Sequence, residues 1–206
     1  MSQSDSVNYT ASWTQICNRA LGRLGGDTIT DMTDGTQSAE YCGRFLPEAI
    51  EYVLGQWDFK FARRRQRLAM NAEQPAFGWT YQFNYPMDCI RLIKVYGSHS
   101  QTPEDIECVP YQVENGKILT DAEELQIIYI ARPDDPNQLP QSVRKAISTH
   151  LAYLLSTPLA SSEQLAGLIA AESQAAIERA KKEDAEMNFD PLASGNRFHT
   201  EARRCI

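Results

Sequence analysis

The spacing of apolar residues changes twice along this chain, and that change limits the possible folds more than any other feature of the sequence. Residues 13–24 and 39–57 place apolar side chains at three- and four-residue steps, the spacing of an amphipathic helix. From 58 to about 133, short apolar and aromatic runs alternate with turn residues, which is typical of strands. Helical spacing returns at 140–158 and again from 163. The order predicts two helices, an antiparallel sheet and two further helices.

Local signals predict where the helices begin and end. Ser12 followed by Gln15 matches the capping box, in which the serine oxygen accepts from the backbone amide of Gln15 and the glutamine side chain reaches back. Pro47 has no amide hydrogen, so we expect a kink or a break in the second helix. Pro140 suits the first turn of the third helix, which we expect to end at Pro158.

The middle of the chain predicts four to five antiparallel strands. Asn115-Gly116 lies between two short apolar runs and is the strongest short hairpin signal. The segments 89–96 and 125–130 are rich in residues that favour strands. Four aromatic residues alternate before them, and we interpret these as a sheet face packed on a core rather than as a surface that stacks nucleic-acid bases. They are Trp79, Tyr81, Phe83 and Tyr85.

These elements predict an α+β fold, in which an antiparallel helical bundle carries an inserted antiparallel β-sheet or barrel. The helices span about 12–57 and 140–188, and the β insertion spans about 58–133. Residues 1–188 are expected to form a single domain. Residues 189–206 show no periodicity, so we expect an extended C-terminal tail that is disordered alone or ordered by a partner.

One basic run stands out in an acidic chain. The net charge is -7 and the isoelectric point is near 5.0, which argues against a protein that grips DNA phosphates. Residues 60–67 nevertheless hold five bases and no acid. Contact with DNA phosphates is one interpretation of this run. The favoured one is an interface with an acidic partner, because complementary charge sets partner choice and register. The candidate interface residues are Arg63, Arg64, Arg65 and Arg67.

The sequence assigns no catalytic residue, cofactor, metal or small-molecule ligand. The five cysteines are scattered, with no CxxC pair and no histidine at ligand spacing, so we expect core thiols rather than a zinc site or a disulfide framework. The nucleophile elbow, the phosphate-binding loop and the zinc-protease motif do not occur. Acidic pairs such as Asp134-Asp135 lie in turn-like segments, and none is singled out for catalysis.

The apolar runs and the N-terminus suggest folding in the cytoplasm. The longest apolar runs fall far short of the ~20 residues that cross a bilayer. Residues 1–10 are polar and acidic and lack the features of a secretory signal.

Several segments, in a fixed order, carry a family resemblance. They are residues 16–25 (ICNRALGRLG), the Asp- and Thr-rich loop that follows, Trp57-Asp58-Phe59, Arg63–Leu68, residues 83–91 (FNYPMDCIR) and residues 128–140 (IYIARPDDPNQLP). In this order the chain resembles tail tubular protein A, the head-to-tail adaptor of short-tailed bacteriophages and related gene-transfer particles. The resemblance covers about residues 12–157.

The resemblance implies a structural protein of the virion neck or tail, assembled in the host cytoplasm, and not an enzyme. It implies a closed ring of about twelve copies between the portal protein and the tail nozzle protein, with double-stranded DNA passing through. We further expect the tail to become ordered on docking to the portal, through Phe198, Arg203, Arg204 and Ile206. Two alternatives stay open, a cell-envelope polysaccharide hydrolase associated with a phage tail and a small DNA-binding module.

Overall fold

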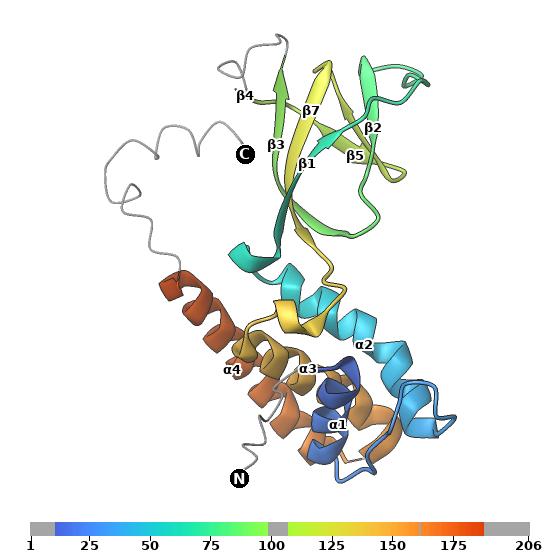
Figure 1. The fold of residues 1–206 in the computed structure, drawn as a ribbon, viewed down its shortest axis with the longest axis vertical. Coiled ribbons are helices and arrows are strands. Elements are labelled where there is room, and N and C mark those ends of the chain that lie inside the picture. Colours follow the sequence, from blue (N-terminus) through green and yellow to red (C-terminus); the bar gives the residue numbers. More distant parts are fainter. Residues whose placement is uncertain (1–10, 99–106, 161, 188–206) are drawn as a thin grey trace, which may run out of the picture. The chain divides into compact units, whose positions relative to one another are not determined.

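The computed structural model describes residues 11–98, 107–160 and 162–187. Contacts between Cα atoms divide the chain into two compact units. The helical unit contains the chain up to Trp57 together with Pro133–Asp184, and the β unit contains Asp58–Arg132 and, among the described residues, also residues 185–187. The predicted mixture of helices and antiparallel sheet is confirmed, and Figure 1 shows both kinds of element.

Apart from the last three residues of the fourth, the helical unit holds the four α-helices of the described residues. These are α1 (Trp13–Arg23), α2 (Gln37–Gly55), α3 (Gln141–Ala160) and α4 (Glu163–Met187), with a short 3-10 helix at Pro136–Gln138. Ser12 caps α1 as predicted, since its Oγ accepts from the amide of Gln15 at 3.1 Å. Thr36 and Ser162 cap α2 and α4 in the same way. Their hydroxyl oxygens accept from the amides of Ala39 and Leu165, at 3.2 and 3.4 Å respectively.

Two helices continue through a proline. Of the kink or break expected at Pro47, the break does not occur in α2, and the expectation that α3 ends at Pro158 is wrong, because α3 continues to Ala160. A proline removes one backbone hydrogen bond, but α2 buries apolar side chains both before and after Pro47, including Leu46 and Ile50. Packing of this stripe holds the helix together across the missing bond.

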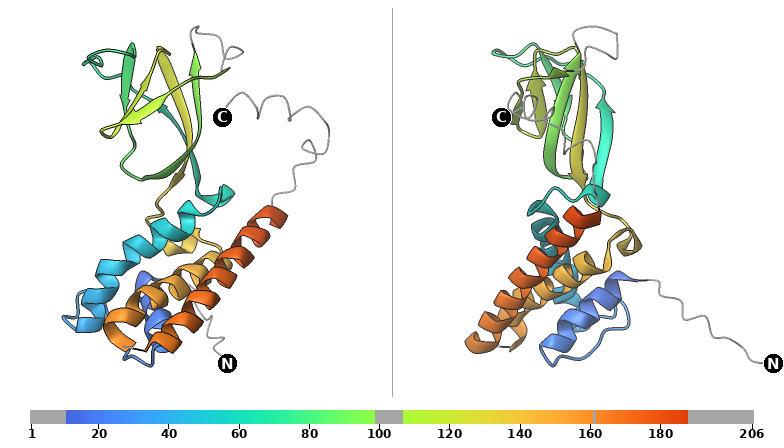
Figure 2. Two further views of the ribbon diagram at one scale, coloured as in Figure 1. Left: turned by 180° about the vertical axis from the view of Figure 1, so that it is seen from behind. Right: turned by 90° about the vertical axis from the view of Figure 1, so that its left-hand side faces the viewer.

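Helix α3 forms the centre of the helical unit. It lies between α2 and α4 in both the front and the rear views (Figures 1 and 2). Each fully buried aliphatic side chain on such a helix contributes roughly 1.5–3 kcal/mol of transfer free energy. Its buried apolar residues are Val143, Ala146, Ile147, Leu151, Ala152 and Leu155.

A buried histidine joins α3 to α2 and α4. The Nδ1 atom of His150 lies 3.1 Å from the hydroxyl of Ser173 on α4, and its ring stacks on Tyr52 of α2 at 4.1 Å. Tyr153 contacts the same ring from α3, at 5.8 Å between centroids. Burial lowers the pKa of His150 below its ordinary value, since the charged form loses hydration.

His150 makes the stability of the protein depend on pH. Its folded pKa is lower than its unfolded pKa of about 6.5, so the unfolded chain binds the proton first. The stabilising contribution is therefore complete above about pH 6.5 and declines below it, by at most ~1.4 kcal/mol per pH unit. Urea unfolding at pH 7 and pH 5.5 should show a smaller acid-dependent loss for His150→Gln than for the wild type. An equal loss in both proteins would rule out this role.

The β unit contains two antiparallel sheets. The four-stranded sheet has the order β1 (Arg63–Leu68), β7 (Glu124–Ala131), β3 (Cys89–Ser98), β4 (Glu107–Cys108). The three-stranded sheet has the order β2 (Tyr81–Asn84), β6 (Lys117–Thr120), β5 (Gln112–Glu114). The described residues thus form seven strands where four to five were expected, and the two sheets do not close into the barrel that was the alternative.

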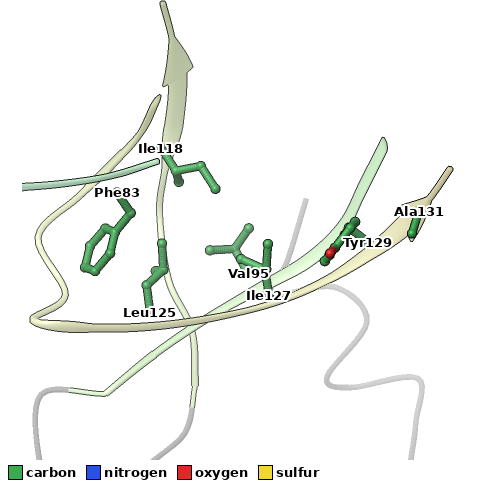
Figure 3. Close-up of a cluster of buried hydrophobic side chains, with 7 residues drawn as sticks. All are labelled: Phe83, Val95, Ile118, Leu125, Ile127, Tyr129 and Ala131. Atoms are coloured by element: carbon green, nitrogen blue, oxygen red, sulfur yellow. The ribbon is translucent and has the colours of Figure 1, made fainter. Parts of the chain in front are cut away.

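The predicted hairpin is present, and the predicted aromatic face is present except for Trp79, which precedes β2 and donates to the side chain of Gln112 at 3.3 Å instead of joining the core. Asn115 and Gly116 have φ angles of 47° and 70° and connect β5 to β6, as a two-residue turn requires. Phe83 is fully buried, and Tyr81 and Tyr85 pack against the same core. Figure 3 shows Phe83 and Ile118, from the three-stranded sheet, together with Leu125, Val95 and Ile127, from the four-stranded sheet. One hydrophobic cluster therefore joins the two sheets.

The cysteines are only partly as expected. Cys17 and Cys42 are buried free thiols of the helical core, and Cys89 is a half-buried free thiol. Cys108 is disulfide-bonded, so the expectation of thiols alone is wrong at this position.

Gly97 on β3 lies where no side chain fits. A Cβ atom there would lie 2.4 Å from the Cβ of Ala122 and 2.6 Å from Cγ1 of Val109. Gly97→Ala is therefore expected to lower the free energy of unfolding by at least about 2 kcal/mol, through overpacking. The matched control is Gly43→Ala on α2, where no atom lies within 4 Å of the added carbon and a gain of about 0.5–1 kcal/mol is expected. Equal effects of both changes on the free energy of unfolding in urea would contradict the close packing around Gly97.

Candidate partner-docking surface

The arginine run forms β1, an edge strand of the four-stranded sheet. Within the described residues it pairs with β7 alone, in the register Arg63 with Ile130, Arg65 with Ile128 and Arg67 with Gln126. Since successive side chains of a strand point to opposite faces, the run is divided between two faces of the sheet. The residue directly opposite Arg64 is Tyr129, which belongs to the buried cluster. Arg64 therefore lies on the core side.

Arg64 takes part in a polar network at the edge of the core. Its guanidinium lies 2.6 Å from the carboxylate of Asp88. The hydroxyl oxygen of Tyr129 lies 3.2 Å from Oδ1 of the same carboxylate and 3.2 Å from Oε1 of Gln66, and its one hydrogen can be donated to either acceptor. Burial, followed by the negative charge of Asp88, raises the pKa of Tyr129. Arg64 thus has a structural role within the β unit.

The outer face of β1 carries the other arginines. Arg63 donates two hydrogen bonds to the carboxylate of Asp58, one of them from Nε at 2.7 Å. The side chains of Arg65 and Arg67 are exposed, and within the described part of the chain they make no ion pair or hydrogen bond. They line a shallow cavity of about 160 Å³ together with Tyr96 and Gln126.

Strand β3 adds two further bases to this face. Arg91 lies opposite Ile130 and Lys94 lies opposite Ile128, on the side of β7 that faces away from the cluster. Residues directly opposite each other in a sheet project from the same face. We call this surface the basic face, and it consists of Arg63, Arg65, Arg67, Arg91 and Lys94.

Sequence reasoning missed Arg91 and Lys94 because β3 is irregular. Residues three apart in a regular strand project from opposite faces. The register of β3 against β7 shifts twice, between Cys89 and Arg91 and between Leu92 and Lys94. Such bulges change which face a side chain reaches. A bulge leaves no clear signal in a single sequence, so simple alternation separates two residues that the sheet brings together.

The basic face contrasts with the charge of the rest of the protein. In the helical unit, residues 11–57 and 133–184 contain 13 acidic residues (Asp and Glu) and eight basic ones (Lys and Arg). In the β unit, residues 58–98 and 107–132 contain eight acidic residues and nine basic ones. Long basic side chains cover apolar neighbours with their stems and keep their charged ends in water. Ile128 and Ile130, between the basic rows, are accordingly only 7% and 0% exposed. The arrangement suits contact with an extended anionic surface.

The remaining predicted interface residues lie outside the described part of the chain. These are Phe198, Arg203, Arg204 and Ile206. Among the described residues, no group of three or more His, Cys, Asp and Glu is arranged to hold a metal ion. None of the helices described combines the length and apolar character needed to span a bilayer.

Comparison with known proteins adds no family. No protein-family model matches the chain, and no curated protein is significantly similar to it in sequence.

Proposed function

We propose that this protein is a structural head-to-tail adaptor of a bacteriophage virion, forming a ring between the portal and the tail nozzle around the DNA exit channel. The observation that carries the proposal is the basic face, an array of cations in a protein of net charge -7. Complementary charge at an interface fixes partner and register. The resemblance over residues 12–157 supplies the identity of the partners.

The proposed mechanism is geometric. The helical unit, taken as an antiparallel bundle, makes contacts between copies around the ring. The basic face docks on an acidic surface of the nozzle protein, with Arg65 and Arg67 contributing charges that no described residue neutralises. The tail from residue 189 docks on the portal through Phe198, Arg203, Arg204 and Ile206. In this proposal no step requires a catalytic group or a cofactor.

Ring assembly tests the proposal directly. Purified protein is mixed with portal rings and then with nozzle protein of the same virion, and the particles are imaged by electron microscopy. Closed rings between portal and nozzle are the expected result. Absence of rings on the cognate portal would sink the adaptor proposal. Truncation at Phe189 is expected to weaken portal binding, and unchanged affinity would remove the tail from the proposed interface.

The basic face also supports a second candidate function, a DNA-binding module. Its exposed arginines would release counterions on contact with phosphates, so affinity would fall steeply with salt. Retention of duplex DNA by the isolated protein, with a slope that decreases when Arg65 is replaced by alanine, would favour this alternative over nozzle docking.

A further inference from the structure

A large cleft lies within the helical unit, between α1, α3 and α4. Its volume is about 810 Å³, and half of the bases of the helical unit line it. These are Arg19 and Arg23 from α1, Lys145 from α3 and Arg179 from α4. The two acids of the lining are Glu172 and Glu183. The cleft therefore carries an excess of positive charge in a unit that is otherwise acidic.

Two of the four bases are already paired inside the cleft. Arg23 forms an ion pair with Glu172, and Nε of Arg179 lies 2.8 Å from the carboxylate of Glu183. Hydrogen bonds from Arg179 and Ser142 lower the pKa of Glu183. Within the described residues, no ion pair forms at Arg19 or at Nζ of Lys145. These two positive charges, one on α1 and one on α3, are available to an anionic partner.

Outside the cleft, four acids follow one another between the end of α1 and the first turn of α2, and we call them the acidic patch: Asp27, Asp31, Asp34 and Glu40. All four residues are exposed, and none of them lines the cleft. Hydrogen bonds from Thr33 and Thr36 lower the pKa values of Asp31 and Asp34 respectively, so both carboxylates are ionised at neutral pH.

Hydrogen bonds tie the loop that carries Asp27, Asp31 and Asp34 to α1. The side-chain amide of Asn18 donates to the carbonyl of Ile29 at 2.9 Å, and its oxygen accepts from the amide of Ile29 at 2.8 Å. Ile29 itself is 4% exposed and anchors the loop in the core. A segment that is already ordered loses little conformational entropy on binding. The loop is thus an ordered acidic surface whose negative charge is opposite to the positive charge of the cleft.

We propose that the cleft is the docking site for the acidic patch of a second copy of this chain. Each copy offers one cleft and one patch, so the contact is head-to-tail and can repeat around a closed ring. Arg19 and Lys145 of one copy face the carboxylates of the next. The inference rests on the ring of the proposed function, because it names the contact between neighbouring copies.

Isotope-coded cross-linking tests the contact between copies. Unlabelled and ¹⁵N-labelled chains are mixed, with and without portal rings, and treated with a carbodiimide that joins an amine to a carboxylate. The expected product joins Lys145 of one isotope to Asp27 or Glu40 of the other. Products joined only within one copy would overturn the inference. Cross-links between the two isotopes in the absence of portal-bound rings would uphold the contact between copies but reject the adaptor proposal. Portal-bound rings without cross-links between the two isotopes would uphold the adaptor proposal but reject this contact.

Charge exchange provides the matched variants. Arg19→Glu with Lys145→Glu is expected to reduce self-association at least tenfold, and Asp27→Lys with Glu40→Lys is expected to do the same. The chain that carries all four changes should recover part of the association, since the exchanged positions again pair opposite charges while Asp31 and Asp34 remain negative. Asp31 and Asp34 are left in place because they order the loop. Sedimentation measures association, and thermal unfolding confirms that each variant is folded.

A single substitution outside the cleft controls for net charge. Arg44 is exposed on α2 and does not line the cleft, so Arg44→Glu is expected to leave association within twofold of the wild type. Arg19→Glu changes the net charge equally but should weaken association severalfold. Equal effects of the two changes would show that overall charge, and not the cleft, controls association.

Discussion

Replacing Arg65, Arg67 and Lys94 together with glutamate is expected to reduce affinity for the nozzle protein at least ~100-fold, or about 2.7 kcal/mol. Each change converts attraction to an acidic surface into repulsion. The three side chains are exposed, and among the described residues they make no ion pair, so the fold should be retained. Surface plasmon resonance at constant salt measures the affinity, and circular dichroism measures the fold.

The control for this variant is Arg44→Glu, an exposed base on α2 that is not part of the basic face. It should leave the affinity for the nozzle unchanged. Arg64→Ala is a second comparison, because it removes the partner of Asp88 on the core side of β1 and should act on stability instead. If the triple variant binds the nozzle as the wild type does but no longer retains duplex DNA, the basic face is a DNA-binding surface.

Replacing Phe83 with alanine is expected to destabilise the β unit by about 3–5 kcal/mol. The ring is fully buried and packs with residues of both sheets, including Ile118 and Leu125 (Figure 3). Its removal loses the transfer free energy of an aromatic side chain and leaves a cavity between the sheets. Urea unfolding followed by circular dichroism should show the loss as a lower midpoint.

Phe77 provides the matched control because it is the same residue in the same unit and is 87% exposed. Phe77→Ala is expected to change the free energy of unfolding by less than about 0.5 kcal/mol. A loss below about 1 kcal/mol for Phe83→Ala would mean that the two sheets are not held together by this cluster.

The sequence by itself determined the features that depend on interactions between residues a few positions apart. Ser12 caps α1 because its hydroxyl reaches an amide three residues away, and Asn115-Gly116 forms a turn because these residues tolerate positive φ. The buried stripe of α3 follows from helical spacing alone. Each of these signals is contained in a few consecutive residues.

The prolines show where local chemistry is overruled. Pro47 and Pro158 weaken a helix by removing one hydrogen bond each, and the sequence therefore predicted a kink or a break at Pro47 and a helix end at Pro158. In the folded protein α2 continues through Pro47, because the apolar stripe on both sides of it is buried. A local penalty of a few kcal/mol is offset by burial that involves distant parts of the chain.

Tertiary structure alone decided the two charged surfaces. The basic run was visible in the sequence, but strand alternation turned Arg64 toward the core and left Arg65 and Arg67 outside. The register shifts of β3 brought Arg91 and Lys94 to the same face. The cleft likewise combines Arg19, Lys145 and Arg179, which lie on three helices far apart in the sequence. Charge at a surface depends on register and helix packing, which are set by contacts between distant residues and therefore leave no local pattern to read.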